Sequence, residues 1–435
     1  MSDFDLLIRG REQDIAISDG KIVVAGENIS GSATAEVDAR ELAIFPGVID
    51  AHVHFNEPGR THWEGFATGS RAAAAGGTTT IFDMPLNSHP PTIDGPSFDL
   101  KRAAAEESCI VDFGLWGGLV PGNLDELETL RDRGVVGFKA FMCSSGIEDF
   151  TAADDATLRL GMKRAAELDL PVAVHAESQE MTAALALRTH AAGKHSVRDY
   201  LDSRPIAAEL EAIQRAIDLA GETRCRLHVV HVSSAAGVER VAQARRAGVD
   251  VSCETCPHYL LLSEEDMERL GAVAKCAPPL RSAVEQHELR ERLADVQTIG
   301  SDHSPAPWEL KAQEDFFAVW GGISGCQHLL PLLLGDGIDS ETAARLTSQN
   351  VAERFRISGK GKLHVGYDAD FTLVDFAGQE EITVESLLYR HRHSPYVGRM
   401  LRARVVRTFL RGQEIYGNGS VASRRPGRFV RPQIS

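Results

Sequence analysis

Between residue 44 and residue 301 the chain repeatedly alternates short β-branched segments with longer segments of helical periodicity. This alternation is typical of βα units whose strands form a parallel sheet. We predict eight strands, at Ile44–Phe55, Thr78–Met84, Val111–Trp116, Val135–Phe141, Pro171–Glu177, Arg226–Val232, Val249–Cys253 and Val296–Ser301. Eight βα units over about 300 residues predict an α/β fold of the TIM (β/α)8 barrel type.

One intervening segment illustrates the helical pattern. Residues 207–220, AAELEAIQRAIDLA, place Leu210, Ile213 and Ile217 at helical spacing. Pro205 lies just before this segment, where we expect it at the first helical position.

Both ends of the chain have a different, strand-and-turn character. Apolar alternation at Leu6–Ile8 and Ile15–Ile17 is followed by the turn Ser18-Asp19-Gly20, and segments 361–376 and 404–416 are again short strands divided by glycine turns. We therefore expect the two ends to combine into one small β domain. The predicted organisation is a discontinuous β domain of residues 1–48 and 355–435, and a catalytic barrel domain of residues 49–354.

Composition excludes several classes of protein. No apolar run approaches the roughly 18 residues that span a bilayer, so a membrane protein is excluded. Asp3 and Asp5 stand where a signal peptide would carry basic residues, and a cytoplasmic enzyme is expected. The formal net charge of −16 argues against a nucleic-acid partner. The odd number of cysteines, seven, predicts buried free thiols rather than a disulfide framework.

Candidate metal-binding side chains stand near the carboxyl ends of five predicted strands, which face one common site in a TIM barrel. They are His52, His54, Lys139, His175, His231 and Asp302. The i, i+2 spacing turns the first two imidazoles to the same side of their strand. Two histidines at this spacing are, taken alone, weak evidence for a metal site. A single histidine at a strand end is usually a hydrogen-bonded core residue. Six suitable groups on one barrel face indicate a site for two metal ions.

Lys139 needs a separate argument, because an ammonium group cannot bind a cation. Burial and two neighbouring dications both favour the neutral amine. That amine can take up carbon dioxide as a carbamate, whose two oxygens can bridge two metal ions. We therefore expect Lys139 to be carboxylated.

Other polar residues are interpreted as structural. We expect His228 to pack on the opposite face of its strand from His231, and the Cys253 and Cys256 pair to have no metal or redox role. His258 is equally compatible with a supporting role at the site and a purely structural one. The remaining histidines of polar segments are expected to be solvated, namely His190, His195, His391 and His393.

These residues lie in segments that resemble the cyclic amidohydrolases, the family that includes dihydroorotases, dihydropyrimidinases (hydantoinases) and allantoinases. The resemblance extends over essentially the whole chain, through PGVIDAHVHFNEPG (46–59), GFKAFMCSSG (137–146), VHAE (174–177), LHVVHVSS (227–234), CETCPHYL (253–260), SDHSP (301–305) and RHRHSPYVGR (390–399). It implies a TIM barrel with a β-sandwich formed by both ends, a binuclear centre that usually holds zinc, and a homotetramer.

The resemblance also implies a role for each candidate ligand. His52 and His54 match the ligands of one metal ion, and His175 and His231 match those of the other. Lys139 matches the carboxylated lysine that bridges them. Asp302 matches the aspartate that binds metal and moves protons, which makes it the expected catalytic residue.

Within the family, the allantoinase group matches best. Dihydroorotases have an arginine where this chain has Asn56, and without that cation a substrate carboxylate would be buried unpaired. Hydantoinases have a tyrosine where this chain has Ser144. Segments 57–80, 203–213, 320–325 and 389–399 resemble allantoinases.

The expected reaction is therefore metal-dependent opening of the hydantoin ring of allantoin to allantoate, a step of purine catabolism. Ser144, Asn87 and Gly322 are the expected substrate-binding residues. The alternatives are a hydantoinase or dihydropyrimidinase, a dihydroorotase-like amidase, and an inactive scaffold homologue. Inactive relatives commonly lose metal ligands, whereas all six candidates are present here.

Overall fold

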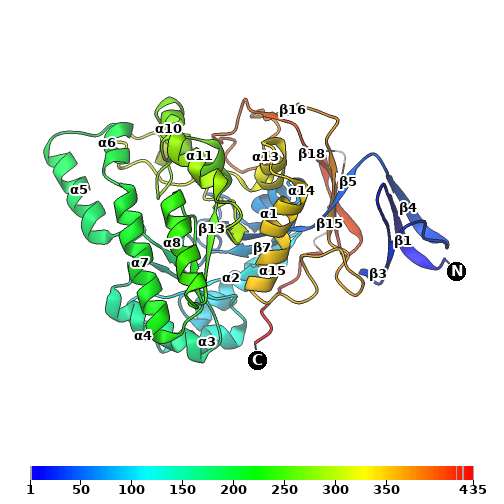
Figure 1. Ribbon diagram of the computed structural model, residues 1–435, viewed down its shortest axis with the longest axis horizontal. Helices are drawn as coiled ribbons and strands as arrows, with labels where there is room; N and C mark the ends of the chain where they lie inside the picture. The colour runs from blue at the N-terminus through cyan, green and yellow to red at the C-terminus, as the bar shows by residue number, and fades with distance from the viewer. Residues whose placement is uncertain (1, 418, 424–425, 435) are drawn as a thin grey trace.

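A barrel of parallel strands forms the centre of the protein in the computed structural model, which describes residues 2–417, 419–423 and 426–434 (Figure 1). The strands form two hydrogen-bonded sheets, ordered β6-β7-β8 and β9-β10-β11-β12-β13-β14. Their bounds are β6 (Val48–Val53), β7 (Thr78–Asp83), β8 (Asp112–Leu115), β9 (Gly117–Gly118), β10 (Phe138–Phe141), β11 (Val172–His175), β12 (Leu227–Val229), β13 (Val251–Thr255) and β14 (Thr298–Ile299).

Two connections close this barrel. Trp116 alone separates β8 from β9, so one bent strand belongs to both sheets. At the other edge, the amide of His54 donates to the carbonyl of His303 at 2.8 Å, and Val53 bridges to His303 in parallel register. The predicted TIM barrel is thereby confirmed, and each of the eight predicted segments overlaps a barrel strand.

The first predicted strand, Ile44–Phe55, is in fact two strands. Its beginning is β5 (Ala43–Pro46), which pairs antiparallel with β15 (Phe371–Asp375) outside the barrel. The chain changes sheets at Gly47, where a β-carbon would lie 2.2 Å from the Thr79 hydroxyl oxygen. Only glycine permits this close approach.

Helices cover the outside of the barrel and follow its strands in turn (Figure 1). They are α1 (Phe66–Ala75), α2 (Gly95–Ser108), α3 (Glu126–Arg133), α4 (Asp155–Glu167), α5 (Gln179–Ala191), α6 (Val197–Asp202), α7 (Ile206–Thr223), α8 (Ala235–Arg246), α9 (Pro257–Leu261), α10 (Glu264–Leu270), α11 (Ala283–Glu291), α12 (Trp308–Lys311), α13 (Leu329–Gly335), α14 (Ser340–Ala344) and α15 (Asn350–Arg354). The predicted helix after Pro205 is α7, which buries Ile213 and Ile217. Pro205 caps α7 rather than occupying its first turn.

Both chain ends contribute to a second, β-rich region at the right of Figure 1. One sheet has the order β3-β2-β1-β4 and the other β20-β19-β18-β15-β5. The new strands are β1 (Phe4–Gly10), β2 (Asp14–Ser18), β3 (Lys21–Gly26), β4 (Ala33–Ala39), β18 (Arg404–Leu410), β19 (Gln413–Gly417) and β20 (Ser420–Val421), and β16 (Glu380–Glu381) pairs separately with β17 (Met400–Leu401). One apolar core contains residues of both sheets, among them the stacked rings of Phe371 and Phe409. The predicted domain boundaries remain a prediction.

The interior contains all seven cysteines as free buried thiols, as predicted. Among the described residues, no helix is both long and apolar enough to cross a membrane.

A buried ion cluster joins the barrel to the β-rich region. Lys360 Nζ lies 2.8 Å from Asp112 at the start of β8, 3.1 Å from Asp368 and 2.5 Å from Asp370. Arg411, from the turn between β18 and β19, also pairs with Asp112. Burial alone lowers the pKa of Lys360, but the three carboxylates outweigh it and raise this pKa. Among the described residues, Lys360 is the one cation that pairs with all three carboxylates of the cluster.

We expect Lys360→Met to lower the free energy of unfolding by about 3–5 kcal/mol, because the substitution leaves the buried Asp370 carboxylate without its ion-pair partner. Urea denaturation followed by circular dichroism measures this loss. Lys21→Met is the control, since Lys21 also pairs with Asp368 but its side chain is 49% exposed. Its expected cost is about 0–1 kcal/mol. Equal losses in the two variants would contradict the assignment.

Candidate metal centre

The barrel fold brings the six predicted ligands to one end of the strands. His52 lies in β6 with His54 just after it, Lys139 lies in β10, and His175 ends β11. His231 and Asp302 follow β12 and β14. Five of the six line one cavity of about 540 Å³, and Lys139 is fully buried.

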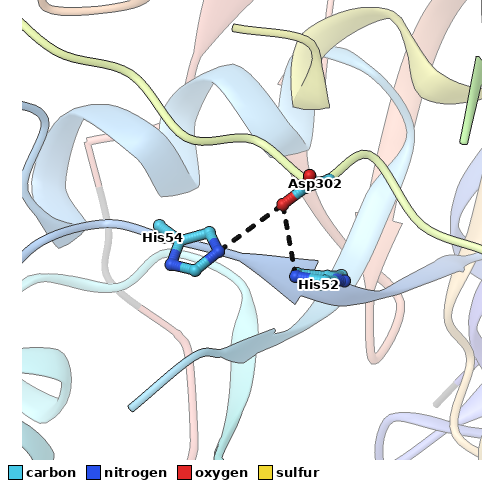
Figure 2. Close-up of side chains that lie close together, drawn as sticks. All are labelled: His52, His54 and Asp302. Atoms are coloured by element: carbon cyan, nitrogen blue, oxygen red, sulfur yellow. Dashed lines mark ion pairs between the residues drawn. The ribbon is translucent and has the colours of Figure 1, made fainter. Parts of the chain in front are cut away.

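The first group of ligands gathers around Asp302 (Figure 2). Asp302 Oδ1 lies 3.2 Å from His52 Nε2 and 3.5 Å from His54 Nε2. Burial alone would raise the pKa of Asp302, but the neighbouring histidines outweigh it and hold this pKa well below its usual range. A carboxylate and two imidazole nitrogens thus converge on one point.

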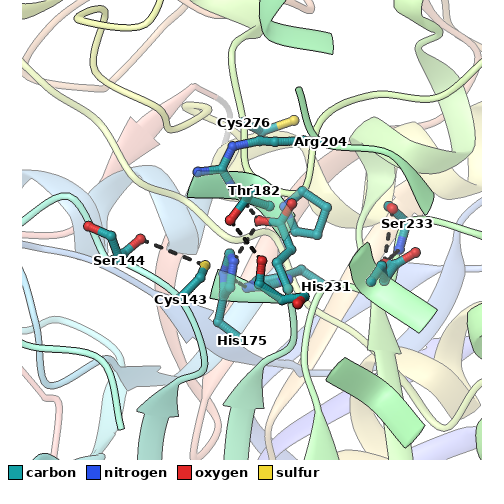
Figure 3. Close-up of polar contacts among 12 residues, drawn as sticks. Cys143, Ser144, His175, Thr182, Arg204, His231, Ser233 and Cys276 are labelled. Carbon is teal, nitrogen blue, oxygen red and sulfur yellow. Dashed lines mark hydrogen bonds and ion pairs between the residues drawn. The ribbon is translucent and has the colours of Figure 1, made fainter. Parts of the chain in front are cut away.

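The second group contains His175 and His231 (Figure 3). His175 Nδ1 and His231 Nε2 are 3.1 Å apart. Two nitrogens bound tetrahedrally to one zinc ion at about 2.0–2.1 Å would lie about 3.4 Å apart, so this approach suits a shared cation. Burial, helped by the charge of His175, lowers the pKa of His231 well below its usual value and favours the neutral imidazole.

Lys139 differs from the other buried lysines of the barrel. Its side chain is 0% exposed, and Nζ has no hydrogen-bond partner among the described residues. Burial lowers the pKa of Lys139 to about 7, which makes the neutral amine accessible near neutrality. A buried amine without a hydrogen-bond partner, near enough to His231 and Asp302 to interact with their charges, fits a lysine that is completed by a further group.

Two glutamates, which sequence reasoning missed, fix the orientation of the imidazoles. His52 Nδ1 donates to Glu254 Oε1 at 2.7 Å, and His175 Nε2 donates to Glu177 Oε2 at 2.8 Å. In each ring the opposite nitrogen is then left free to accept a cation. Glu177 lies two residues after His175, a spacing that could have revealed it, whereas Glu254 comes from the distant strand β13.

Left-handed backbone accompanies this site. His231 has φ of 41° and Asp302 has φ of 47°, and Asn56 and Asn87 at other strand ends are also in this region. Such backbone is uncommon outside glycine and is stabilised only by its surroundings. It turns side chains toward the cavity that a regular strand would direct elsewhere.

His228 corrects one prediction. We expect it to pack on the opposite face of the strand from His231. It does pack, since it is buried with its ring 5.3 Å from that of Phe355, but its side chain lies toward Glu254, the residue that pairs with His52. Its Nδ1 contacts Ser252 Oγ at 2.8 Å, and Nε2 lies 3.9 Å from Glu254. The left-handed turn at His231 breaks the alternation of the strand, so both histidines face inward.

The remaining histidines and cysteines that we interpret as structural differ in their exposure. His190 and His195 are exposed, as predicted. His393 is not fully solvated, because it is partly buried and contacts the Ala306 carbonyl at 2.9 Å; His391 is also partly buried. His258 is buried without a hydrogen-bond partner in the described part of the chain. Cys253 and Cys256 belong to none of the potential metal-binding groups found there.

The three predicted substrate-binding residues all line the cavity. Ser144 is exposed, and the amide of Asn87 contacts the Ser304 hydroxyl at 3.4 Å. Gly322 donates its N–H to the Lys275 carbonyl and its own carbonyl accepts from Lys311 Nζ, so only the second lone pair of that carbonyl retains capacity for a ligand. Asn56 is buried, and its amide lies 3.4 Å from the Pro305 carbonyl. Arg204 lines the cavity, but its charge is paired with Glu177.

Comparison with known proteins agrees with this geometry. The sequence pattern of the amidohydrolase family matches residues 43–415. The chain belongs to the amidohydrolase family. Curated relatives include an allantoinase from Rubrobacter xylanophilus, 56% identical over 100% of this chain and 99% of that protein, and one from Solibacter usitatus, 52% identical over 97% and 94%. Among solved structures, an L-hydantoinase (dihydropyrimidinase) from Arthrobacter aurescens aligns with a TM-score of 0.95 at 35% identity, covering 98% of this chain and 99% of that chain.

We expect Glu254→Gln to weaken metal binding by about 10- to 100-fold, because His52 loses the carboxylate that orients it. Competition with a chelator, followed by metal analysis of the protein, measures the change. Asp14→Asn is the control, since Asp14 is a buried carboxylate paired with Arg9 far from the cavity. Unchanged metal affinity in Glu254→Gln would refute the orienting role.

Proposed function

We propose that this chain is an allantoinase that hydrolyses the cyclic amide of allantoin to allantoate. The observation that carries the proposal is full-length identity of 56% to a curated allantoinase, which extends through every segment that supplies the cavity. The hydantoinase of similar fold is less similar in sequence, at 35% identity. Among the described residues, the one arginine that lines the cavity is already paired, which suits a neutral substrate.

The centre would hold two divalent cations, which we propose to be zinc. His52, His54 and Asp302 would hold one ion and His175 and His231 the other, with carboxylated Lys139 between them. When bound, such ions lower the pKa of water and polarise an amide carbonyl. Imidazole and carboxylate donors suit zinc, although other divalent ions accept the same donors.

Asp302 is the proposed proton carrier. Its Oδ1 faces His52 Nε2 and His54 Nε2, and it lines the cavity where the amide carbon would lie. The carboxylate would accept a proton as water attacks the amide carbon, and would return it to the ring nitrogen as the C–N bond breaks. The product is the acyclic carboxylate.

Ser144, Asn87 and the Gly322 carbonyl would orient the ring. Hydrogen bonds from these groups act on positions of the substrate that do not react, so they contribute mainly to binding geometry. We further propose a cytoplasmic homotetramer with a role in purine catabolism, in line with the sequence expectations.

Substrate assays test the proposed reaction. After metal supplementation, the purified protein should hydrolyse allantoin with a higher kcat/KM than hydantoin, dihydrouracil or dihydroorotate. Chelation should abolish the activity, and added metal should restore it. Preference for hydantoin or dihydrouracil would make the chain a hydantoinase, and metal content below one ion per chain would support an inactive homologue.

Asp302→Asn tests the proton carrier. The amide keeps an oxygen that can face the cation but cannot move a proton, so kcat should fall by about 10²–10⁴-fold while most metal remains bound. Turnover and metal content are measured on the same preparation. Near-normal turnover would rule out the proposed role of Asp302.

A further inference from the structure

One wall of the cavity is an irregular segment, residues 316–322, which we call the cavity loop. It follows α12 and contributes Phe317, Val319, Trp320 and Gly322 to the cavity lining. No strand ladder or helix organises its carbonyl groups. Its conformation must therefore depend on other donors, since buried carbonyls are costly when unpaired.

Two buried lysines supply these donors. Lys275 Nζ lies 2.7 Å from the carbonyl oxygen of Phe316, 3.0 Å from that of Phe317 and 2.6 Å from that of Val319. Lys311 Nζ lies 2.9 Å from the carbonyl oxygen of Trp320, 2.6 Å from that of Gly322 and 3.0 Å from that of Ala272. Each ammonium thus uses all three of its N–H donors.

These two lysines are unusual because their charge has no close carboxylate. They are 4% and 2% exposed, and no ion pair involves either one within the described residues. Burial lowers the pKa of both lysines to about 7. The six carbonyl contacts favour the charged form, because a buried charge is expensive unless it is hydrogen-bonded. The lysines and the cavity loop therefore stabilise each other.

The backbone of Lys275 adds a further contact to the same loop. Its carbonyl accepts the N–H of Gly322 at 2.8 Å, so side chain and main chain bind opposite ends of the segment. The Trp320 ring also packs edge-on against the Trp63 ring, with the two ring centroids 4.7 Å apart. The two lysines and this aromatic contact together fix the loop.

We propose that Lys275 and Lys311 are positioning residues for substrate binding, because they hold the cavity loop in the conformation that forms one wall of the site. The proposal rests on the proposed function only in the choice of substrate. A wall that contacts non-reacting parts of the substrate contributes equally to the ground state and the transition state. Loss of either ammonium should then raise KM and leave kcat nearly unchanged.

Lys275→Met and Lys311→Met remove the charge while keeping a side chain of similar length. Each should raise KM for allantoin by about 10-fold or more, change kcat by less than about 2-fold and leave the metal content unchanged. Lys360→Met is the matched control, since it also removes a buried ammonium but lies in the ion cluster outside the cavity. It should lower stability without raising KM.

Hydrogen exchange of the Trp320 and Gly322 amides tests the loop without any substrate. Exchange should accelerate in both cavity-loop variants and not in Lys360→Met. If Lys311→Met does not fold, Lys311→Gln keeps two N–H donors and should show a smaller change in the same direction. Unchanged exchange, or a fall in kcat at constant KM, would overturn the proposal. If the unmodified protein does not turn over allantoin but exchange still accelerates in the two cavity-loop variants, only the proposed substrate is rejected.

Discussion

The whole site depends on the closure of the barrel at the hydrogen bond from the His54 amide to the His303 carbonyl. This bond joins the first strand to the last, which are about 250 residues apart in sequence. It places Asp302 directly beside His52 and His54. Without closure, the two halves of the first ligand group would belong to separate edges of an open sheet. The candidate site therefore forms only when the barrel is closed.

Two carboxylates and an arginine hold the candidate ligands in position. Glu254 and Glu177 each fix one nitrogen of an imidazole, and Arg204 pairs with Glu177. Lysines serve two different purposes in the same barrel. Among the described residues, Lys139 Nζ has no hydrogen-bond partner, whereas Lys275 and Lys311 have every donor occupied. Burial lowers the pKa of all three lysines to about 7, so their hydrogen bonding, and not their pKa, distinguishes them.

The sequence predicted much of the barrel, because period and strand-end position are local properties of the chain. It also predicted that His52 and His54 lie close to Asp302 and that His175 lies close to His231. It could not predict that Gly47 divides the first segment, since that follows from contact with Thr79. The inward turn of His228 and the pairing of Glu254 with His52 were also missed. The first depends on left-handed backbone, and the second on a neighbour that is distant in sequence.

The pairing of β5 with β15 has a consequence for the order of events during synthesis. The ribosome completes β5 at Pro46 but reaches Phe371 only after 324 intervening residues. At about 5–20 residues per second, the early strand waits roughly 15–65 s for its partner. Over that interval the apolar strands β1 to β5 lack the part of their core that Phe371, Leu373 and Phe409 supply, and the barrel can assemble first. Chaperone dependence during translation would therefore be concentrated in the amino-terminal strands.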